Sequence, residues 1–316
     1  MNTKPARDGF GEGLLALCQE RADVVVLDAD VSKSTRTNWI GDRFPKQFFN
    51  MGISEQDMVG TASGLALGGM VPFVATYGVF LSGRAWDQIR TTVCYNNLPV
   101  KFGGAHAGIS VGPDGATHQA LEDIAITRVL PNMTVLAPCD AEEVRKATIA
   151  AAACPGPVYI RFGREPVPVI TDEKSPFEIG KAVWLKTGSD VAIIACGAMV
   201  YQALQAADQL AKESIHATVV NLHTIKPMDR DSVIRAASTC GCVVTAEEHQ
   251  IAGGMGSAVA ETLAAACPVP IEFVGIHDSF GESGQPDELM EKYGLSAAVI
   301  ISASKRALQR KQNAAT

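Results

Sequence analysis

Short apolar runs alternate with helix-length segments along the first half of the chain, and this alternation limits the possible folds more than any other feature of the sequence. Strands that are buried on both faces of a sheet are nearly continuous apolar runs. The pattern therefore predicts an α/β fold, in which a parallel, doubly wound sheet has helices on both faces. The runs are VVVLD (24–28), VPFVAT (71–76), PVKFGG (99–104), MTVLAP (133–138) and PVYIRF (157–162).

A change of composition after this first pattern predicts a domain boundary. Residues 165–178, EPVPVITDEKSPFE, contain three prolines and charges of both signs, which is typical of a linker. A second α/β pattern starts with DVAIIACG (190–197). The sequence therefore predicts two doubly wound α/β domains, a first of residues 1–174 and a smaller second of residues 175–316.

A helix start is predicted at Asp140, which begins a D-A-E-E segment followed by a run of strong helix formers. An acidic side chain at this position can accept hydrogen bonds from the backbone N–H groups of the first turn. We therefore expect Asp140 to cap a helix.

Charge and hydrophobicity exclude several classes of function. With a formal net charge of −7 and a pI of about 5.4, the chain has no basic stripe with which to bind nucleic acid. No segment approaches the roughly 20 apolar residues of a membrane span, and the first residues contain no apolar signal region. We expect a cytoplasmic protein that binds neither nucleic acid nor membrane.

The eight cysteines predict free thiols rather than a metal site. Six of them stand singly among apolar or small residues, as buried thiols do. Cys240 and Cys242 form a C-x-C pair, but no second pair of ligands is near them, and alternate residues of a strand face opposite ways. We therefore predict no metal ligands in this chain.

A single acidic residue, Glu55, opens a segment of small and apolar residues, GISEQDMVGTASGLALGG (52–69). Ser54 and Asp57 could cap a helix here, in which case Glu55 is a first-turn acid stabilised by the helix dipole. Alternatively, the helix is apolar nearly all round and buried, which would raise the pKa of Glu55 and let its carboxyl group donate a hydrogen bond. The stretch alone leaves both interpretations open.

A glycine-rich loop, GGAHAGISVGPDGATHQALED (103–123), contains His106, Asp114 and His118. It leaves a predicted strand of the sheet, and ligands of open α/β sheets bind at the carboxyl ends of the strands. Long loops in compact domains tend to be functional, although a polar surface loop is the alternative. The spacing of the two histidines matches no common zinc pattern, so metal binding fits this loop less well.

Taken together, these stretches resemble the C-terminal half of transketolase, a thiamine diphosphate enzyme. The resemblance covers almost the whole chain, and the pattern GxDGxTHQxxED is specific for this branch of the family. It implies a pyrimidine-binding domain up to about residue 170, followed by a transketolase C-terminal domain. The segments that carry it are GISEQDMVGTASGLA, VPFVATYGVFLSGRAWDQIR, GAHAGISVGPDGATHQALEDIA, PNMTVLAPCDAEE, RFGRE, NLHTIKPMD and TAEEHQIAGGMGSAVAE.

The resemblance implies that four residues contact the cofactor. In the family, the glutamate that Glu55 matches donates a hydrogen bond to the aminopyrimidine ring, which requires a neutral carboxyl group. Tyr77 and Phe80 match aromatic residues that pack against the pyrimidine. Asp30 matches an acid near the thiamine.

The resemblance also implies a substrate site. His106 and His118 match histidines that contact sugar hydroxyls and assist proton transfers, for which a pKa near neutrality is suited. Asp114 matches the acid that contacts the C2 hydroxyl of the acceptor. Arginine binds phosphate well through two parallel hydrogen bonds. The residues that match the phosphate-binding set are Arg7, Ser34 and Arg164.

Some positions depart from the family pattern. Gly83 stands where some relatives have a third aromatic residue, Tyr77 replaces a common phenylalanine, and Pro113 replaces an acid. These departures bear on cofactor contacts and on substrate preference.

The largest departure is that no GDG motif occurs in the 316 residues. Family members hold magnesium (or calcium) and the cofactor diphosphate through this motif. The resemblance therefore implies a partner chain with a GDG motif, which would supply the metal and diphosphate half. We expect a heterotetramer with two chains of each kind, in which neither chain is active alone.

The function implied is that of one subunit of a split transketolase in carbohydrate metabolism, within the pentose phosphate pathway. It would transfer a two-carbon ketol unit from a ketose phosphate to an aldose or aldose phosphate. Alternative enzymes are a 1-deoxyxylulose phosphate synthase half, which would require a 2-oxoacid donor, and a 2-oxoacid dehydrogenase beta subunit. A non-catalytic, regulatory transketolase-like subunit is a third alternative.

Overall fold

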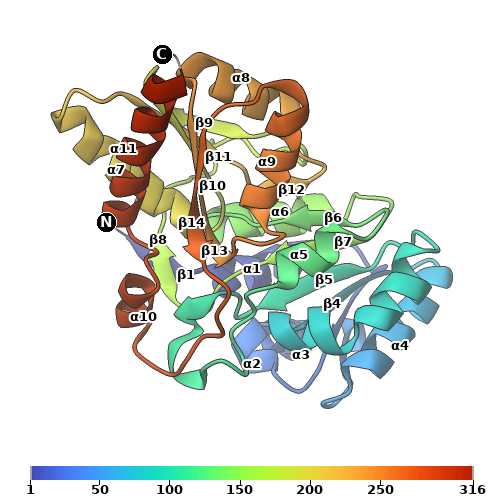
Figure 1. Cartoon of the computed structure of the whole chain (residues 1–316). Helices are drawn as coiled ribbons and strands as arrows, with labels where there is room; N and C mark the ends of the chain where they lie inside the picture. The colour runs from blue at the N-terminus through green and yellow to red at the C-terminus, as the bar shows by residue number, and fades with distance from the viewer. Residues whose placement is uncertain (1, 315–316) are drawn as a thin grey trace.

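The computed structural model describes residues 2–314, which form two α/β domains, one above the other in Figure 1. The first domain contains a seven-stranded sheet in which every neighbouring pair of strands is parallel except one at the edge. The predicted α/β fold is confirmed. The strands of this sheet are β2 (Val24–Asp28), β3 (Phe48–Asn50), β4 (Val71–Tyr77), β5 (Lys101–Ala105), β6 (Thr134–Leu136), β7 (Val158–Arg161) and β12 (Thr224–Lys226).

The strand order of the first sheet is β12-β6-β7-β5-β4-β2-β3, with β12 antiparallel to β6. Alternate residues of β2 point to opposite faces, as the period of a strand requires. Val24 and Val26 belong to the core beneath one helix layer, whereas Val25 and Leu27 belong to the core beneath the other. Both faces of the sheet are therefore buried, which explains the continuous apolar runs.

Two helix layers cover the first sheet. On one face, α1 and α6 pack against each other and contribute to the same core as Val24. On the other face lie α4, α5 and two π-helical segments. The first layer consists of α1 (Ala6–Glu20) and α6 (Ala141–Ala151), and the second of α4 (Glu55–Leu67), α5 (Asp123–Arg128) and the segments Phe80–Arg84 and Gln88–Cys94. The remaining short helices of this domain are α2 (Ser32–Thr35), α3 (Asn38–Arg43) and the 3-10 helices Pro45–Gln47 and Ile109–Asp114.

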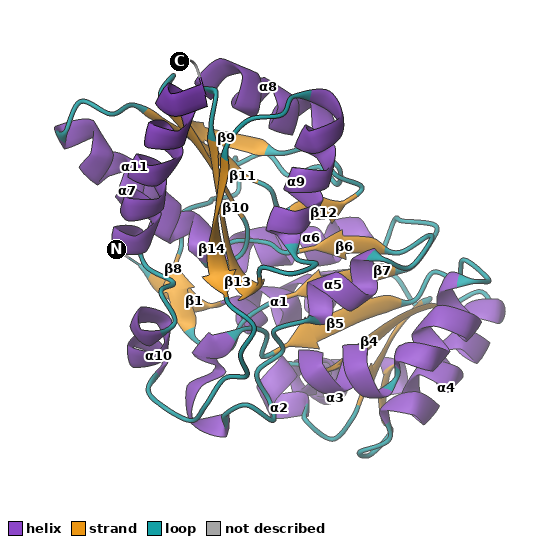
Figure 2. Cartoon of the chain, in the orientation of Figure 1, coloured by secondary structure: helices purple, strands orange, loops and turns teal. Residues whose placement is uncertain are grey.

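The second domain contains a five-stranded sheet with the same kind of layering, which Figure 2 shows nearly edge-on. Its order is β14-β13-β10-β11-β9, and only the edge strand β9 is antiparallel to its neighbour. Its strands are β9 (Val183–Lys186), β10 (Val191–Ala195), β11 (Ala217–Asn221), β13 (Val243–Gln250) and β14 (Ile271–Ile276). Its helices are α7 (Met199–Lys212) and α11 (Ala297–Ala314) on one face, α8 (Arg230–Cys240) and α9 (Met255–Ala266) on the other, and the short α10 (Pro286–Lys292).

The two domains share one apolar core where they meet. Ala137 of the first domain and Leu222 of the second belong to the same buried cluster. The backbone N–H of Ala137 donates to the carbonyl oxygen of His223 at 2.8 Å, and β12, which lies beyond the predicted boundary, joins the sheet of the first domain. The contact between the domains therefore includes both apolar packing and a shared sheet.

The predicted linker lies against the first domain. The short strands β1 (Thr3–Pro5) and β8 (Pro166–Pro168) pair antiparallel, and Lys146 Nζ donates to the carbonyl oxygens of Asp172 and Ser175. Phe177 also packs against the core under α1. The predicted boundary after residue 174 stays a prediction.

All eight cysteines are free thiols, and six of them are buried. Within residues 2–314, no group of three or more His, Cys, Asp or Glu side chains is arranged to hold a metal ion. The same residues include no helix with the length and hydrophobicity needed to cross a membrane.

Asp140 connects the linker to α6, and the predicted helix cap is confirmed. Its Oδ1 accepts from the backbone N–H of Glu143 at 2.9 Å, which is the expected N-cap bond. Its Oδ2 accepts from the backbone N–H groups of Ile170 and Thr171, both at 2.7 Å. One fully buried carboxylate therefore satisfies donors from two segments.

We expect Asp140→Ala to lower the free energy of unfolding by about 2 to 4 kcal/mol, because it removes a helix cap and leaves linker N–H groups without an acceptor. Urea unfolding followed by circular dichroism measures this loss. Limited proteolysis should cut the linker faster than in the wild type. Glu142→Ala, which removes an acid that pairs with Arg145 on the same helical turn, is the control. Equal stability and equal cleavage of the two variants would contradict the role of Asp140.

Candidate active site

Four ring side chains gather at the carboxyl end of the first sheet: Tyr77, Phe80, His106 and His118, called the ring cluster below. Tyr77 ends β4 and His106 directly follows β5. The ring centroids of Tyr77 and His106 are 4.3 Å apart, those of Phe80 and His118 are 5.2 Å apart, and those of Tyr77 and His118 are 5.6 Å apart. The cluster therefore presents flat apolar surface beside polar ring nitrogens, which suits an organic ring.

Glu55 lies beside this cluster. Its side chain is 2% exposed, and its Oε2 accepts from Arg84 Nη1 at 2.8 Å. The Arg84 guanidinium in turn lies 4.5 Å over the centroid of Phe80. Within the described part of the chain, Glu55 Oε1 accepts no hydrogen bond, so one carboxyl oxygen remains available to a ligand.

The capping interpretation of this helix start holds only in part. Ser54 is the N-cap residue of α4 and Glu55 lies in the first turn, but the Ser54 side chain makes no capping hydrogen bond. The Glu55 side chain is buried and pairs with Arg84, so it is not a solvated first-turn acid. A neutral Glu55 stays a prediction.

The expectation that α4 is apolar and buried nearly all round is also wrong for the single chain. Met58 and Val59 are fully buried against the sheet, because one face of the helix packs there. Gly60 and Gly64 lie on the opposite face and are exposed, and Leu67 is 75% exposed. Ile53, just before the helix, is 75% exposed as well. An apolar surface of this kind is typical of a contact with another protein.

Asp28 organises the loop that carries Asp30 and Ser34. It is fully buried and accepts from Val31 N and Thr37 Oγ1, both at 2.7 Å. Burial raises the pKa of this carboxyl group. Asp30 has a left-handed backbone (φ 64°) and accepts from Asn50 Nδ2 at 2.9 Å, and it bonds no residue of the ring cluster. The sequence analysis missed Asp28, because its position at the end of an apolar run gives no sign of these partners.

Arg7 is a cation without an acidic partner in the described residues. Its Nη1 donates to the carbonyl oxygen of Ser34 at 3.3 Å, and the Ser34 hydroxyl lies 3.1 Å from the Tyr77 hydroxyl. Its buried Nε has no hydrogen-bond partner. Burial, followed by the charge of Arg36, lowers the pKa of Arg7. A guanidinium held in this way is suited to bind an anion.

Arg164 is the second arginine of the predicted phosphate-binding set. It forms ion pairs at 3.4 Å with Asp114 and with Glu165, and its charge contributes to the lowered pKa of Arg7. The structure therefore brings together the predicted phosphate-binding residues and the predicted sugar-binding Asp114. Arg36, which pairs with Asp8 at 2.6 Å, is a further cation that the sequence analysis did not identify.

The near-neutral pKa expected from the sequence does not hold for His106. Its side chain is buried, and burial, followed by the charges of Arg7 and Arg164, lowers its pKa to about 3. The ring is therefore neutral at physiological pH. Its buried Nδ1 has no hydrogen-bond partner among the residues that the structure describes, which is costly unless a ligand supplies one.

Gly83 and Pro113 are both exposed, so neither departure disturbs the core. A Cβ atom built on Gly83 would meet no other atom within 4 Å. The missing aromatic residue therefore leaves open space close to Arg84.

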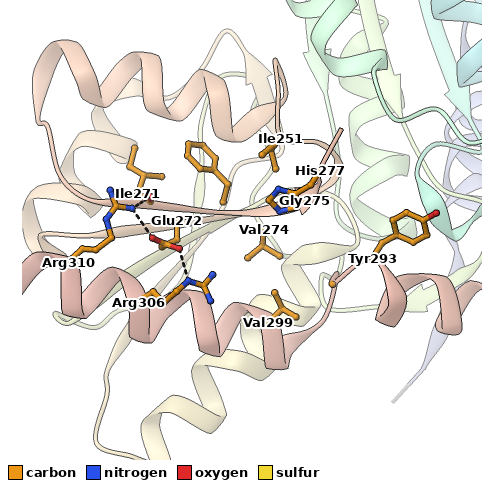
Figure 3. A pocket seen from close by; sticks show the side chains of 12 residues that line it. Ile251, Ile271, Glu272, Val274, Gly275, His277, Tyr293, Val299, Arg306 and Arg310 are labelled. Carbon is orange, nitrogen blue, oxygen red and sulfur yellow. Dashed lines mark hydrogen bonds and ion pairs between the residues drawn. The ribbon is translucent and has the colours of Figure 1, made fainter. Parts of the chain in front are cut away.

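An open pocket of about 510 Å³ lies in the second domain, where β14 and α11 form part of its wall (Figure 3). Its two arginines both bind Glu272: Arg306 Nε lies 2.9 Å and Arg310 Nη1 lies 2.8 Å from the carboxylate. No residue of the predicted site lines this pocket. The candidate active site is therefore the ring cluster with the residues around it.

Comparison with known proteins identifies the two domains. The model of the transketolase pyrimidine-binding domain matches residues 3–169, and the model of the transketolase C-terminal domain matches residues 180–300. The 6-deoxy-6-sulfo-D-fructose transketolase subunit SqwH of Clostridium sp. (strain MSTE9) is 42% identical to this chain, with 96% of this chain and 95% of the relative covered. A putative transketolase C-terminal section of Methanocaldococcus jannaschii is 44% identical, with 94% of each chain covered.

A solved structure is similar to the whole chain. It is described as a split-gene transketolase in an inactive beta4 tetramer. It is 48% identical, covers 97% of this chain and 99% of its own, and has a TM-score of 0.91.

We expect His106 to make the protein less stable in acid. Its pKa is about 3 in the folded chain and near 6.5 when unfolded, so between these values the unfolded state binds more protons and stability falls as the pH falls. The melting temperature of His106→Gln should therefore fall less between pH 7 and pH 5 than that of the wild type. Differential scanning fluorimetry measures both. His216→Gln, which removes an exposed imidazole, is the control. An equal loss in His106→Gln and the wild type would contradict the buried neutral ring.

Proposed function

The chain belongs to the transketolase family, and from this we propose that it is one subunit of a two-chain transketolase that transfers a two-carbon ketol unit from a ketose to an aldose. One observation carries the proposal: the ring cluster and the buried Glu55 lie at the carboxyl end of the sheet with Arg7, which has no acidic partner among residues 2–314. That arrangement offers a flat ring surface, a carboxyl group and an anion site side by side. The family membership supplies the reaction class.

The residues present fit thiamine diphosphate, which supplies the carbanion chemistry of ketol transfer when it is bound. Tyr77 and Phe80 offer faces for the pyrimidine ring. Arg84 occupies Glu55 Oε2, so Oε1 is available in this proposal to donate a proton in a hydrogen bond to a ring nitrogen. The unpartnered Nδ1 of His106 and the open space at Gly83 are consistent with a ligand at this position.

The residues proposed to bind the substrate have two roles: some bind its anionic group, and others bind its hydroxyl groups or transfer protons. Arg7 and Arg164 offer guanidinium groups to the anionic end of a sugar. His106, which stays neutral, exchanges hydrogen bonds with a hydroxyl group without adding a charge. The half-exposed His118 is placed to take up and release a proton, and Asp114 accepts from a second hydroxyl group.

We infer an anionic sugar as the donor class. The Clostridium relative is named for a sulfonated fructose, and a sulfonate resembles a phosphate in charge and in its oxygen acceptors. Arg7 and Arg164 suit either group, because a guanidinium binds oxyanions through parallel hydrogen bonds. A ketose phosphate is the donor that we propose for this chain.

A partner chain completes the site in this proposal. The 316 residues contain no GDG motif, and the described residues form no metal cluster, so Mg²⁺ and the cofactor diphosphate would be held by the partner. Ile53, just before α4, and Leu67, at the far end of α4, are exposed and offer apolar contacts along the helix of Glu55. The chain also spans 95% of the Clostridium relative, which is named as a subunit. A heterotetramer with two chains of each kind is the assembly that we propose.

We expect ketol transfer from xylulose 5-phosphate to ribose 5-phosphate only when this chain is mixed with a GDG-bearing partner chain, thiamine diphosphate and Mg²⁺. Each chain alone should be inactive, because each supplies half of the cofactor site. A coupled assay of the aldose phosphate product measures the transfer. Activity of this chain alone would contradict the divided site. A product that forms only with pyruvate as donor would replace the proposal with 1-deoxyxylulose phosphate synthesis.

We expect Glu55→Gln to lower kcat of the active mixture by at least about 100-fold, because an amide cannot hold and release the carboxyl proton. Circular dichroism and the melting temperature should show a folded variant. Asp57→Asn is the matched control, since Asp57 is an exposed acid on the same helical turn. Turnover of Glu55→Gln at the level of Asp57→Asn would contradict the role of Glu55.

A further inference from the structure

The loop that carries the predicted sugar-binding residues is held by the second domain. The 106–120 loop, which follows β5, closes on itself: Ala107 and Ala120 form an isolated β-bridge, and Gly108 N donates to the carbonyl oxygen of Ala120 at 2.9 Å. Joined ends give a compact loop its own shape. The residues between these ends are held relative to the sheet by contacts with other segments. The main polar contact comes from the end of β13.

Glu248 makes this contact. Its side chain is 5% exposed, and its Oε1 accepts from the backbone N–H of Ser110 at 2.7 Å. Ser110 lies in the 3-10 helix Ile109–Asp114, which ends at the predicted sugar-binding Asp114. A hydrogen bond to a buried charged acceptor is among the stronger kinds in proteins. The bond therefore joins the second domain to the segment that places Asp114.

The approach of this carboxylate depends on Gly108. A Cβ atom at that position would lie 2.2 Å from Glu248 Oε1, which is closer than atoms can approach. Gly108 also has φ +93°, a backbone conformation that favours glycine. The loop is thus shaped to receive the glutamate side chain at its base.

The position of Glu248 is fixed by a second contact. Arg161 Nη2 donates to the carbonyl oxygens of Glu248 at 2.8 Å and of Ala120 at 3.1 Å. Its Nε donates to Asp123 Oδ1 at 3.0 Å. Arg161 therefore holds the backbone of Glu248 against Ala120, at the end of the 106–120 loop. The Glu248 side chain holds Ser110, near the start of the same loop.

A third contact lies at the other side of the loop. Gln119 Nε2 donates to the carbonyl oxygens of Ile109 at 3.1 Å and of Glu282 at 2.9 Å. Pro286, which begins α10, packs so close to Gly112 that a Cβ there would lie 2.9 Å from its ring. The second domain thus supports the loop on two sides.

We propose that Glu248 is a positioning residue for the sugar site: by holding Ser110, it fixes the 106–120 loop and so the placement of Asp114 and His106 toward the substrate. This inference rests on the proposed function, because it assigns the loop a substrate. It also explains why the second domain, which contributes none of the predicted site residues, accompanies the first. The second domain supports the sugar-binding half of the site.

The geometry separates this role from cofactor binding. Glu55 and Arg84 lie on α4 and on the segment Phe80–Arg84, and neither bonds Glu248. Loss of the Glu248 contact should therefore weaken sugar binding and leave Glu55, Tyr77 and Phe80, which lie outside the loop, in place.

Hydrogen exchange of the full-length chain tests the contact without any assay of activity. In Glu248→Ala we expect the amide of Ser110 to exchange about tenfold faster than in the wild type, because its acceptor is gone. Amides of α4 should be unchanged. Glu248→Gln retains an acceptor oxygen and should restore slow exchange. Glu291→Ala removes an acid from the wall of a pocket that Ser110 and Glu248 also line, and it should leave exchange unchanged.

Steady-state kinetics of this chain mixed with the partner chain test whether loss of the Glu248 contact weakens sugar binding. Glu248→Ala should raise KM for the sugar donor about tenfold or more, with the KM for thiamine diphosphate within twofold of the wild type. Equal changes in both constants, or unchanged exchange at Ser110, would overturn the positioning role. Should Glu248→Ala fail to fold, Glu248→Asp, which keeps the charge and shortens the side chain, applies the same test. Faster exchange together with a wild-type mixture that transfers no ketol unit would overturn the proposed function alone.

Discussion

The buried ion pair between Arg161 and Asp123 is the interaction on which the site and the domain contact both depend. Arg161 ends a central strand of the first sheet and is 6% exposed, and Asp123 is 1% exposed. A buried charge is tolerated only when it is paired and its remaining hydrogen-bonding groups are satisfied. The other partners of this pair are Tyr159, which donates to Asp123, and the carbonyl oxygens of Ala120 and Glu248. Because those partners come from the sheet, the 106–120 loop and the second domain, one desolvated pair fixes three parts of the protein relative to one another.

The candidate active site gathers positive charge although the chain as a whole is negative. The chain has a formal net charge of −7, yet Arg7, Arg36 and Arg164 approach one another closely enough to lower the pKa of Arg7. Bringing like charges together costs free energy, and an anionic ligand would recover it. Burial is the largest cause of the lowered pKa of His106, and the charges of the same cations lower it further. The anion site therefore adds to the effect of burial in keeping this imidazole neutral.

Much of the fold could be predicted from local patterns. The five apolar runs each overlap a strand of the first sheet, and Asp140 caps α6 as its segment indicated. These features depend on burial of both sheet faces and on hydrogen bonds between residues close in the chain, so the order of amino acids is sufficient to indicate them. The faces of α4 were not predictable, because its composition is apolar whether the opposite face meets the same chain, a partner or solvent.

For the site, local sequence and family resemblance indicated which residue types stand at the strand ends, and the tertiary structure decided their neighbours and charge states. Glu55, His106 and Asp114 were identified from the sequence and from that resemblance, because each lies in a recognisable local segment. The pairing of Glu55 with Arg84, 29 residues away, and the hydrogen bond from Ser110 to Glu248, 138 residues away, leave no local pattern. The low pKa of His106 likewise arises from burial and from charges contributed by distant segments. Periodicity and capping act between neighbours in the chain, whereas desolvation and long-range pairing exist only after the chain has folded.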